Sequence, residues 1–395
     1  MSRRGIPCGD NNQKGNAMTI EDTLSKRRSR REILKGASVL GGGLLATPYL
    51  SRLAFAEPVE LNMLAWYGHA EPDVVAEFEA ANNVKFKPKY YTGGDNMLGL
   101  ISQSPPGTFD VILSDAEYVQ QLNSAGYIEE LDPKDYPIDD YFPEFQQFPG
   151  NWKDGKLFSI ITRFGFLGVA YNTEAITEKE ASTYNVYWAE KLKGKVGHFD
   201  WHLPNLGQIS LLEGNASPYD IDEAAWGRLQ EKTRTLRPQI GGFFDYGGTF
   251  SSLQNGQMLT IAGIGDWITG TLEKSGAKVR TVIPEEGGLQ WSECFCVGKG
   301  SPKADLARKW IQYITSAEGQ VKSANMAAYP ALIPNRKGWE LLAVETPEEA
   351  KRQGMLLNES NVMDMIRNGR IKYREWPVQQ SLEDWNDFWS EYKGS

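Results

Sequence analysis

Short apolar runs alternate with amphipathic segments along this chain after residue 56. The apolar runs have the length and composition of buried β-strands, and they cover residues 59–65, 85–91, 109–113, 164–172, 196–200, 259–264, 278–283 and 293–297. The amphipathic segments have helical spacing, and they cover residues 96–101, 222–236, 267–273, 303–315 and 318–326, with another helix from Pro72 that carries Val74, Val75, Phe78 and Ala81 on one face. This alternation predicts an α/β protein with parallel-rich sheets and helices on both faces.

The chain is long enough for two lobes. About 340 residues follow residue 56, which is more than one ordinary hydrophobic core accommodates. The predicted strand at 164–172 contains two glycines and suits a hinge connection, and the strand at 293–297 would carry the chain back. We therefore place the first lobe at residues 57–166 and 294–330, and the second at residues 167–293 and 331–395, with hinge strands between them.

The first 56 residues have the pattern of an export signal. Ser29-Arg30-Arg31-Glu32-Ile33-Leu34-Lys35 precedes a short apolar run, and Ala54-Phe55-Ala56 ends it with a small-x-small triplet. The paired Arg30 and Arg31 resemble a twin-arginine signal, with cleavage predicted after Ala56. A charged N-terminal arm is the alternative interpretation, and Met18 is an alternative start.

Charge distinguishes the leader from the rest of the chain. Residues 1–56 hold ten of the 42 Lys and Arg residues and four of the 51 Asp and Glu residues, so the formal net charge of −9 becomes −15 for residues 57–395. An acidic surface disfavours nucleic acid and anionic lipid, and it favours cationic ligands. We expect no nucleic-acid partner and, after cleavage, no membrane-spanning segment.

Enzyme motifs are missing from the sequence. It has no Walker loop, no Gly-x-Ser-x-Gly elbow and no His-Glu-x-x-His. The segment Gly263-Ile264-Gly265-Asp266-Trp267-Ile268 lacks the third glycine of a dinucleotide-binding loop. We interpret His198 and His202 as polar loop residues, because Pro204 and the preceding strand-like run disfavour a shared helical face for a metal. We therefore expect no cofactor, no metal and no catalytic residues.

The two cysteines after the leader are close neighbours. Cys294 and Cys296 are two residues apart on a predicted strand, a spacing that strains a disulfide. We interpret them as a pair of small, buried apolar side chains.

Aromatic residues gather beside carboxylates or at turns. Five such clusters lie at predicted strand ends or turns: Trp66-Tyr67, Asp200-Trp201, Phe244-Asp245-Tyr246, Asp266-Trp267 and Trp291-Ser292-Glu293. A carboxylate can hold an ammonium group by charge-assisted hydrogen bonds, and an aromatic face attracts the same cation. Any single Trp is more often a core residue, but the five clusters together favour a site for a cationic ligand.

The same residues resemble the periplasmic solute-binding proteins of ABC importers, in the spermidine/putrescine-binding branch. The resemblance covers essentially the whole chain after residue 56. Its motifs are the Trp66 opening, Asp110-Val111-Ile112-Leu113-Ser114, Ala170-Tyr171-Asn172, Asn255-Gly256 leading to Ile264-Gly265-Asp266, the block from Pro284 through Trp291 to Glu293, and Tyr329-Pro330 with Pro334-Asn335.

The resemblance implies a two-lobe periplasmic-binding-protein fold of type II and a set of ligand-binding residues. Asp266 and Glu293 would each bind an amine, while Trp291 and Tyr329 would flank the methylene chain. The full candidate set is Trp66, Tyr67, His69, Ser114, Asp115, Asp200, Trp201, Tyr246, Asp266, Trp267, Trp291, Glu293 and Tyr329.

Some positions depart from the family pattern. Tyr67-Gly68-His69 stands where polyamine binders carry a carboxylate, and Gly263 stands where they carry a Trp. The acidic residue expected a few positions after Asp200 is not evident. A diamine or a mono-cation therefore fits the sequence better than a long triamine.

We expect a monomeric periplasmic protein that captures a polyamine between its lobes and delivers it to a membrane permease. Choline, a betaine or an aminoalkyl compound is an alternative ligand. A phosphonate-like anion is disfavoured by Asp266 and Glu293. An exported enzyme is the alternative from a different class, and it would need a nucleophile or a metal cluster.

Overall fold

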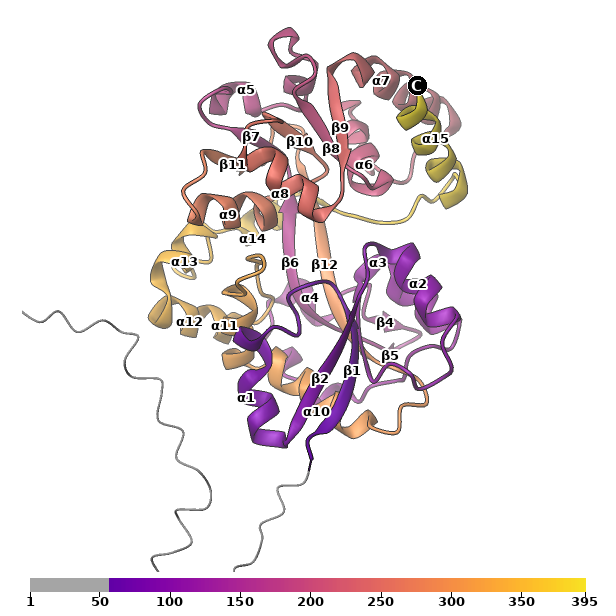
Figure 1. The fold of residues 1–395 in the computed structure, drawn as a ribbon, viewed down its shortest axis with the longest axis vertical. Helices are drawn as coiled ribbons and strands as arrows, with labels where there is room; N and C mark the ends of the chain where they lie inside the picture. Colours follow the sequence, from indigo (N-terminus) through magenta and orange to yellow (C-terminus); the bar gives the residue numbers. More distant parts are fainter. Residues whose placement is uncertain (1–56) are drawn as a thin grey trace, which may run out of the picture. The chain divides into compact units, whose positions relative to one another are not determined.

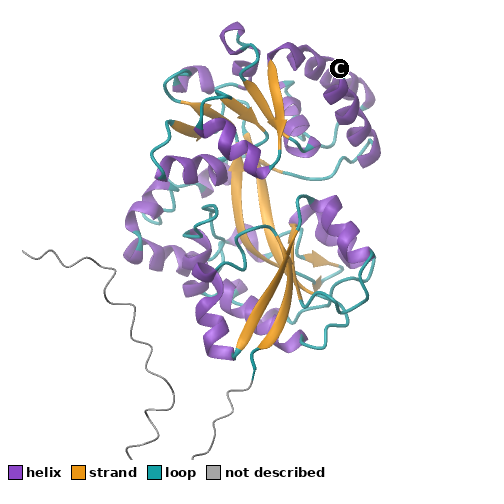
Figure 2. Cartoon of the chain, viewed as in Figure 1, coloured by secondary structure: helices purple, strands orange, loops and turns teal. Residues whose placement is uncertain are grey.

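The computed structural model describes residues 57–395, and these residues form an α/β protein with two main sheets (Figures 1 and 2). Arg30, Arg31 and the predicted cleavage after Ala56 lie outside the described residues. Sheet 1 has the strand order β13-β12-β3-β1-β2, with β6 also paired to β12. Sheet 2 has the order β11-β7-β10-β8-β9.

The strands of sheet 1 are β1 (Val59–Ala65), β2 (Val84–Tyr90), β3 (Val111–Asp115), β6 (Ile160–Leu167), β12 (Gly288–Val297) and β13 (Ile371–Tyr373). Those of sheet 2 are β7 (Val169–Asn172), β8 (Val196–Phe199), β9 (Ile240–Phe244), β10 (Thr260–Ala262) and β11 (Val279–Val282). A small hairpin, β4 (Trp152–Lys153) and β5 (Lys156–Leu157), stands apart from both.

The α-helices are α1 (Pro72–Asn82), α2 (Gly94–Ser102), α3 (Ala116–Ser124), α4 (Pro143–Gln146), α5 (Glu178–Ala181), α6 (His202–Leu212), α7 (Glu223–Leu236), α8 (Tyr246–Gln254), α9 (Asp266–Lys274), α10 (Ala304–Thr315), α11 (Ala317–Ala324), α12 (Arg336–Glu345), α13 (Pro347–Arg352), α14 (Met363–Arg367) and α15 (Leu382–Gly394). In the described part of the chain, no helix is long and apolar enough to span a membrane.

Sheet 1 brings the strand ends of interest together. β1 is parallel to both β2 and β3, and β12 runs antiparallel to β3. Parallel neighbours end at the same edge of a sheet, so the residues after β1 and at the end of β3 lie side by side there. β3 ends at Asp115, two residues after the end of the predicted run 109–113, so Asp115 belongs to this edge.

Two strand connections link the sheets. β6 pairs with β12 in sheet 1, and the chain passes through Gly168 directly into β7 of sheet 2. A Cβ atom at Gly168 would lie 2.2 Å from the carbonyl oxygen of Val282, so this crossing has no room for a side chain. β12 begins at Gly288, earlier than expected, and it leads the chain from β11 back into sheet 1 (Figure 1).

The C-terminal helix α15 packs against α6 and α7 beside sheet 2. Its buried side chains include Trp385, which stacks on Trp226 of α7 with ring centroids 5.2 Å apart. Burial of this aromatic face holds the tail of the chain in place.

The proposed second lobe contains sheet 2 and part of the C-terminal stretch. Residues 167–283 supply all the strands of sheet 2, in keeping with the predicted start of this lobe at residue 167. Within residues 331–395, however, α12 packs on α11, and β13 pairs with β12 of sheet 1. We therefore propose that the second lobe takes only α15 from this C-terminal stretch.

The structure corrects the predictions for Ala81 and for the two histidines, and it confirms the burial of the two cysteines. Ala81 is exposed, so the buried face of α1 consists of Val74, Val75 and Phe78. His198 and His202 are not loop residues: His198 is buried in β8, and His202 is buried at the start of α6. Cys294 and Cys296 are buried and form no disulfide, as the sequence predicts.

Candidate functional site

Two carboxylates lie opposite each other in sheet 1. Asp115 of β3 and Glu293 of β12 are paired residues of the antiparallel ladder, so their side chains leave the same face of the sheet. Trp291, two residues before Glu293, projects from that face as well. Its indole lies over Gly165 of β6, where a Cβ atom would approach within 2.6 Å.

Glu293 contacts three neighbouring side chains. The Tyr329 hydroxyl donates to its Oε1 over 2.7 Å, and Nε2 of His69 lies 3.1 Å from its Oε2. The Nη1 atom of Arg163 is 3.7 Å from the same Oε2. Burial would raise the pKa of Glu293, but His69 and Arg163 outweigh this effect and lower it. Glu293 is therefore ionised.

Arg163 contacts both Glu293 and Tyr329. Its guanidinium lies 4.4 Å from the ring centroid of Tyr329, and its Nη2 donates to the Tyr329 carbonyl oxygen over 2.7 Å. Burial and the charge of Arg163 lower the pKa of His69, against the opposite effect of Glu293. The buried His69 ring is therefore neutral at pH 7.

Asp115 has a different set of partners. Its Oδ1 accepts from Nη2 of Arg374 over 2.7 Å, and its Oδ2 accepts from the Trp66 indole over 3.0 Å. Burial raises the pKa of Asp115 to about 7; the charge of Arg374 opposes this rise, whereas Glu117 and Glu293 add to it. At neutral pH this carboxyl group is thus poised between its two protonation states.

Arg374 lies in a cage of the kind expected for a ligand cation. Its Nη2 and Nε donate to the carboxylates of Asp115 and Glu117, and its guanidinium lies 4.3 Å from the ring centroid of Trp201. Because Trp201 follows β8 of sheet 2, Arg374 also links side chains from the two sheets.

A series of aromatic rings continues the cluster toward sheet 2. Tyr67 is 48% exposed, and its ring centroid lies 6.4 Å from that of Tyr246 at the start of α8. Tyr246 stacks on Trp267 with ring centroids 5.8 Å apart, and the centroids of Trp267 and Tyr329 are 6.2 Å apart. The ring centroid of Tyr329 is in turn 6.5 Å from that of Trp291. The rings thus connect the carboxylates of sheet 1 with two helices of sheet 2.

Asp266, Asp200 and Ser114 have other surroundings. Asp266 is 45% exposed and receives Nη1 of Arg352 at 2.9 Å on both oxygens. It lines a polar cavity of about 420 Å³ formed by α9, β11 and α13. Asp200 is exposed and pairs with Lys393, while the buried Ser114 hydroxyl donates to the carbonyl oxygen of Asp115. The expected pairing of Asp266 with Glu293 around one ligand thus has no direct support in these contacts.

The sequence did not point to Arg163, Arg374 or Glu117. Arg163 carried a signal: it is the single charged residue in the apolar run from Phe158 to Tyr171, and a charge inside a buried strand needs a partner. No local pattern distinguishes Arg374 or Glu117, which meet through the fold 257 positions apart.

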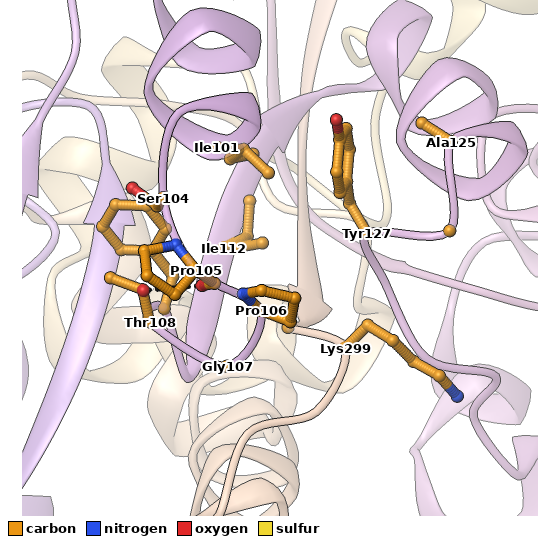
Figure 3. Close-up of a pocket in the computed structure, with 13 residues that line it drawn as sticks. Ile101, Ser104, Pro105, Pro106, Gly107, Thr108, Ile112, Ala125, Tyr127 and Lys299 are labelled. Carbon is orange, nitrogen blue, oxygen red and sulfur yellow. Dashed lines mark hydrogen bonds between the residues drawn. The ribbon is translucent and has the colours of Figure 1, made fainter.

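A further cavity of about 230 Å³ lies elsewhere (Figure 3). It is lined by Pro105, Pro106, Tyr127 and Lys299 among others, and no candidate residue borders it. In the described residues, no group of three or more His, Cys, Asp or Glu side chains could hold a metal ion.

Comparison with known proteins identifies the class. The sequence profile of the bacterial extracellular solute-binding proteins matches residues 73–351, which is well over half of the chain. The chain therefore belongs to this family, whose members are solute-binding proteins and not enzymes.

Relatives within the family are named for polyamines. Spermidine/putrescine-binding periplasmic protein 1 of Haemophilus influenzae is 22% identical over 68% of this chain and 74% of its own length. The spermidine/putrescine-binding periplasmic protein of Escherichia coli is 20% identical over 82% of this chain and 89% of its own length. The expected resemblance to this branch is confirmed.

Solved structures confirm the expected fold. A putative spermidine/putrescine ABC transporter protein from Listeria monocytogenes superposes with a TM-score of 0.71 at 20% identity, covering 85% of this chain and 98% of that one. A binding protein from A. tumefaciens in complex with glucopine gives 0.64 at 17% identity, covering 85% and 97%. The chain thus has the two-lobe periplasmic-binding-protein fold.

Proposed function

We propose that this chain is the periplasmic substrate-binding component of an ABC importer and that it captures a small amine-bearing solute, of the polyamine class or with a single ammonium group. The names of the Haemophilus influenzae and Escherichia coli relatives support an amine. The site between the sheets would close on the solute and present it to a membrane permease.

The observation that carries this proposal is the Asp115–Glu293 pair with its surrounding rings. Two buried carboxylates lie side by side, and Trp66 and Trp291 border them. An ammonium group beside these carboxylates would make charge-assisted hydrogen bonds, while the rings would pack on its methylenes and attract its charge. On this basis Asp115, rather than Asp266, would join Glu293 in anchoring the solute.

An anionic solute is a weaker proposal. Opine-bound proteins share the fold, but both arginines of the cluster are engaged. Arg374 is held between two carboxylates, and Arg163 donates to the Tyr329 carbonyl and lies beside Glu293. An anion would have to displace one of these ion pairs, which is strongly unfavourable for buried partners.

Isothermal titration calorimetry of the purified chain tests the proposal. The ligands are putrescine, spermidine, choline and glycine betaine, with an alkylphosphonate and a sugar phosphate as anionic comparisons. At least one amine or quaternary ammonium compound should bind, and the anions should not. Binding of an anion with no binding of any cation would refute the cationic assignment.

We also propose export by the twin-arginine route, supported by Arg30 and Arg31 ahead of Ala54-Phe55-Ala56. Mass-spectrometric mapping of the exported protein should find Glu57 at its N-terminus. The paired substitution of Arg30 and Arg31 by Lys should retain the precursor in the cytoplasm. An exported protein with an intact leader would contradict this proposal.

A further inference from the structure

Five charged side chains are buried together at the proposed site. Three are carboxylates and two are guanidinium groups, and each side chain is at most 5% exposed: Asp115, Glu117, Glu293, Arg163 and Arg374. The two ion-pair groups adjoin, because Asp115 and Glu293 are cross-strand partners. With all three carboxylates ionised, this buried cluster carries one uncompensated negative charge.

Among the described residues, the neighbouring His69, Tyr91, Tyr118 and Tyr329 supply no compensating positive charge. His69, on the Glu293 side, has a pKa lowered by burial, and burial holds the pKa values of the Tyr91 and Tyr329 hydroxyls well above their usual range. Tyr118, on α3, has its pKa raised for the same reason. Glu375 carries negative charge and is exposed to solvent, which screens it.

The place for a second cation is already filled by the protein. Arg374 occupies a cage made by two carboxylates and the face of Trp201, which is the environment a ligand ammonium group would need. Arg374 therefore acts as an internal substitute for one of the amines of a diamine.

We infer that the site takes a solute with one positive charge and an apolar or neutral polar remainder, and that it rejects diamines and longer polyamines. This inference rests on the proposed function and refines its substrate class. One ammonium group restores neutrality in the buried cluster. A second would leave an uncompensated positive charge beside side chains that are at most 5% exposed, which is strongly disfavoured.

Calorimetry with two ligands of matched length tests this inference. 4-Aminobutan-1-ol has the chain of putrescine but one charge. It should bind at least tenfold more tightly than putrescine at pH 8. Tighter binding of putrescine would overturn the inference and leave the proposed function standing. Failure of both, together with failure of choline, glycine betaine and spermidine, would overturn the proposed function itself.

The charge count also predicts a switch in preference. The Arg374→Gln variant would leave the cluster with two uncompensated negative charges, so the ratio of putrescine to 4-aminobutan-1-ol affinity should rise at least tenfold. Arg234→Gln is the matched control, because Arg234 forms an exposed ion pair with Glu391 and the same charge is lost there. An unchanged ratio in a folded Arg374→Gln protein would contradict the inference.

A second variant keeps the test decisive if Arg374→Gln does not fold. Glu117→Gln removes the uncompensated charge and keeps a hydrogen-bond acceptor for Arg374. The affinity for 4-aminobutan-1-ol should then fall at least tenfold. Unchanged affinity in this variant would show that the buried charge balance does not select the ligand.

Discussion

Asp115 is a residue on which opposing electrostatic effects meet. Burial and two neighbouring carboxylates favour its neutral form, whereas Arg374 and the Trp66 indole favour its charged form. A bound cation would also favour the charged form of Asp115. At the residue scale, the proposed binding step is therefore the replacement of a proton near Asp115 by the charge of the solute.

The Asp115→Asn variant tests the charge of this group while keeping a side chain of the same shape. The affinity for a cationic solute should fall by about 2–5 kcal/mol, because a buried ammonium would lose a carboxylate partner. Calorimetry measures this loss, with Glu391→Gln as a remote control that removes one exposed carboxylate. Equal affinity in the parent and the Asp115→Asn protein would remove Asp115 from the site.

The raised pKa of Asp115 predicts a pH dependence of binding. Below about pH 7, protons compete with the cation for this carboxylate, so affinity should fall by up to about tenfold for each further pH unit. Above about pH 7 the affinity should level off. Titrations in buffers of different ionisation enthalpy should show proton release on binding near pH 7, and proton uptake would contradict the assignment.

The raised pKa of Asp115 also makes the free energy of unfolding of the ligand-free protein depend on pH. Between about pH 4 and pH 7 the folded chain retains a proton on Asp115 that the unfolded chain has lost. The contribution of this group to the free energy of unfolding therefore falls as pH rises through that window. The Asp115→Asn variant should lack this component of the pH profile.

Elements with a strong local signal were predictable from the sequence. β1 and α7 fall within a residue of their predicted bounds, because alternating or helical periodicity and an Asp222 cap define them locally. The crossing through Gly168 was also predicted, from its glycines. In contrast, the burial of His198 depends on Asn205 and on Tyr392 of α15, 194 positions away, which no local pattern reveals.

The candidate site was predictable only in part, because some of its residues come together from distant parts of the sequence. The rings and Glu293 stand in local motifs, so the sequence could mark them. The cations that balance the carboxylates come from β6 and from the segment after β13, and sheet topology alone brings them there. The prediction that Asp266 anchors an amine came from the family resemblance, and in the fold Arg352 forms an ion pair with Asp266.

At the scale of elements, α15 should contribute to stability and not to ligand affinity. Its Trp385 is fully buried against α7, so Trp385→Ala should lower the free energy of unfolding by about 3–5 kcal/mol. Denaturant unfolding measures this change. Val344→Ala, at a residue that is 79% exposed, should stay within about 0.5 kcal/mol of the parent. A strong loss of ligand affinity in folded Trp385→Ala protein would mean that α15 acts on the site.

For residues 57–395 as a whole, the two sheets are joined by strands, and side chains from both meet at the rings. Tyr246 of α8 donates to the Ala328 carbonyl oxygen over 3.2 Å, and its ring lies near Tyr67. These contacts are polar or aromatic and partly exposed, so they can separate and re-form as the proposed lobes open and close.

Hinge closure predicts a compaction that solution scattering can detect. Small-angle X-ray scattering should give a smaller radius of gyration at saturating amine than in the ligand-free protein. Because a preclosed free form would also show no change, Tyr246→Ala is measured in parallel, since it should open the free protein. Identical curves in all states would count against closure by a hinge.

Native mass spectrometry of the full chain with a ligand mixture tests the central claim most directly. The protein is incubated with equimolar putrescine, 4-aminobutan-1-ol, choline, glycine betaine, an alkylphosphonate and a sugar phosphate; the complexes are then isolated, and each ligand is released and identified by its own mass. Because the buried cluster of three carboxylates and two guanidinium groups has one uncompensated negative charge, the dominant species should be a 1:1 complex with a singly charged cation. A dominant complex with putrescine or with an anion, or no complex with any cation, would contradict the account.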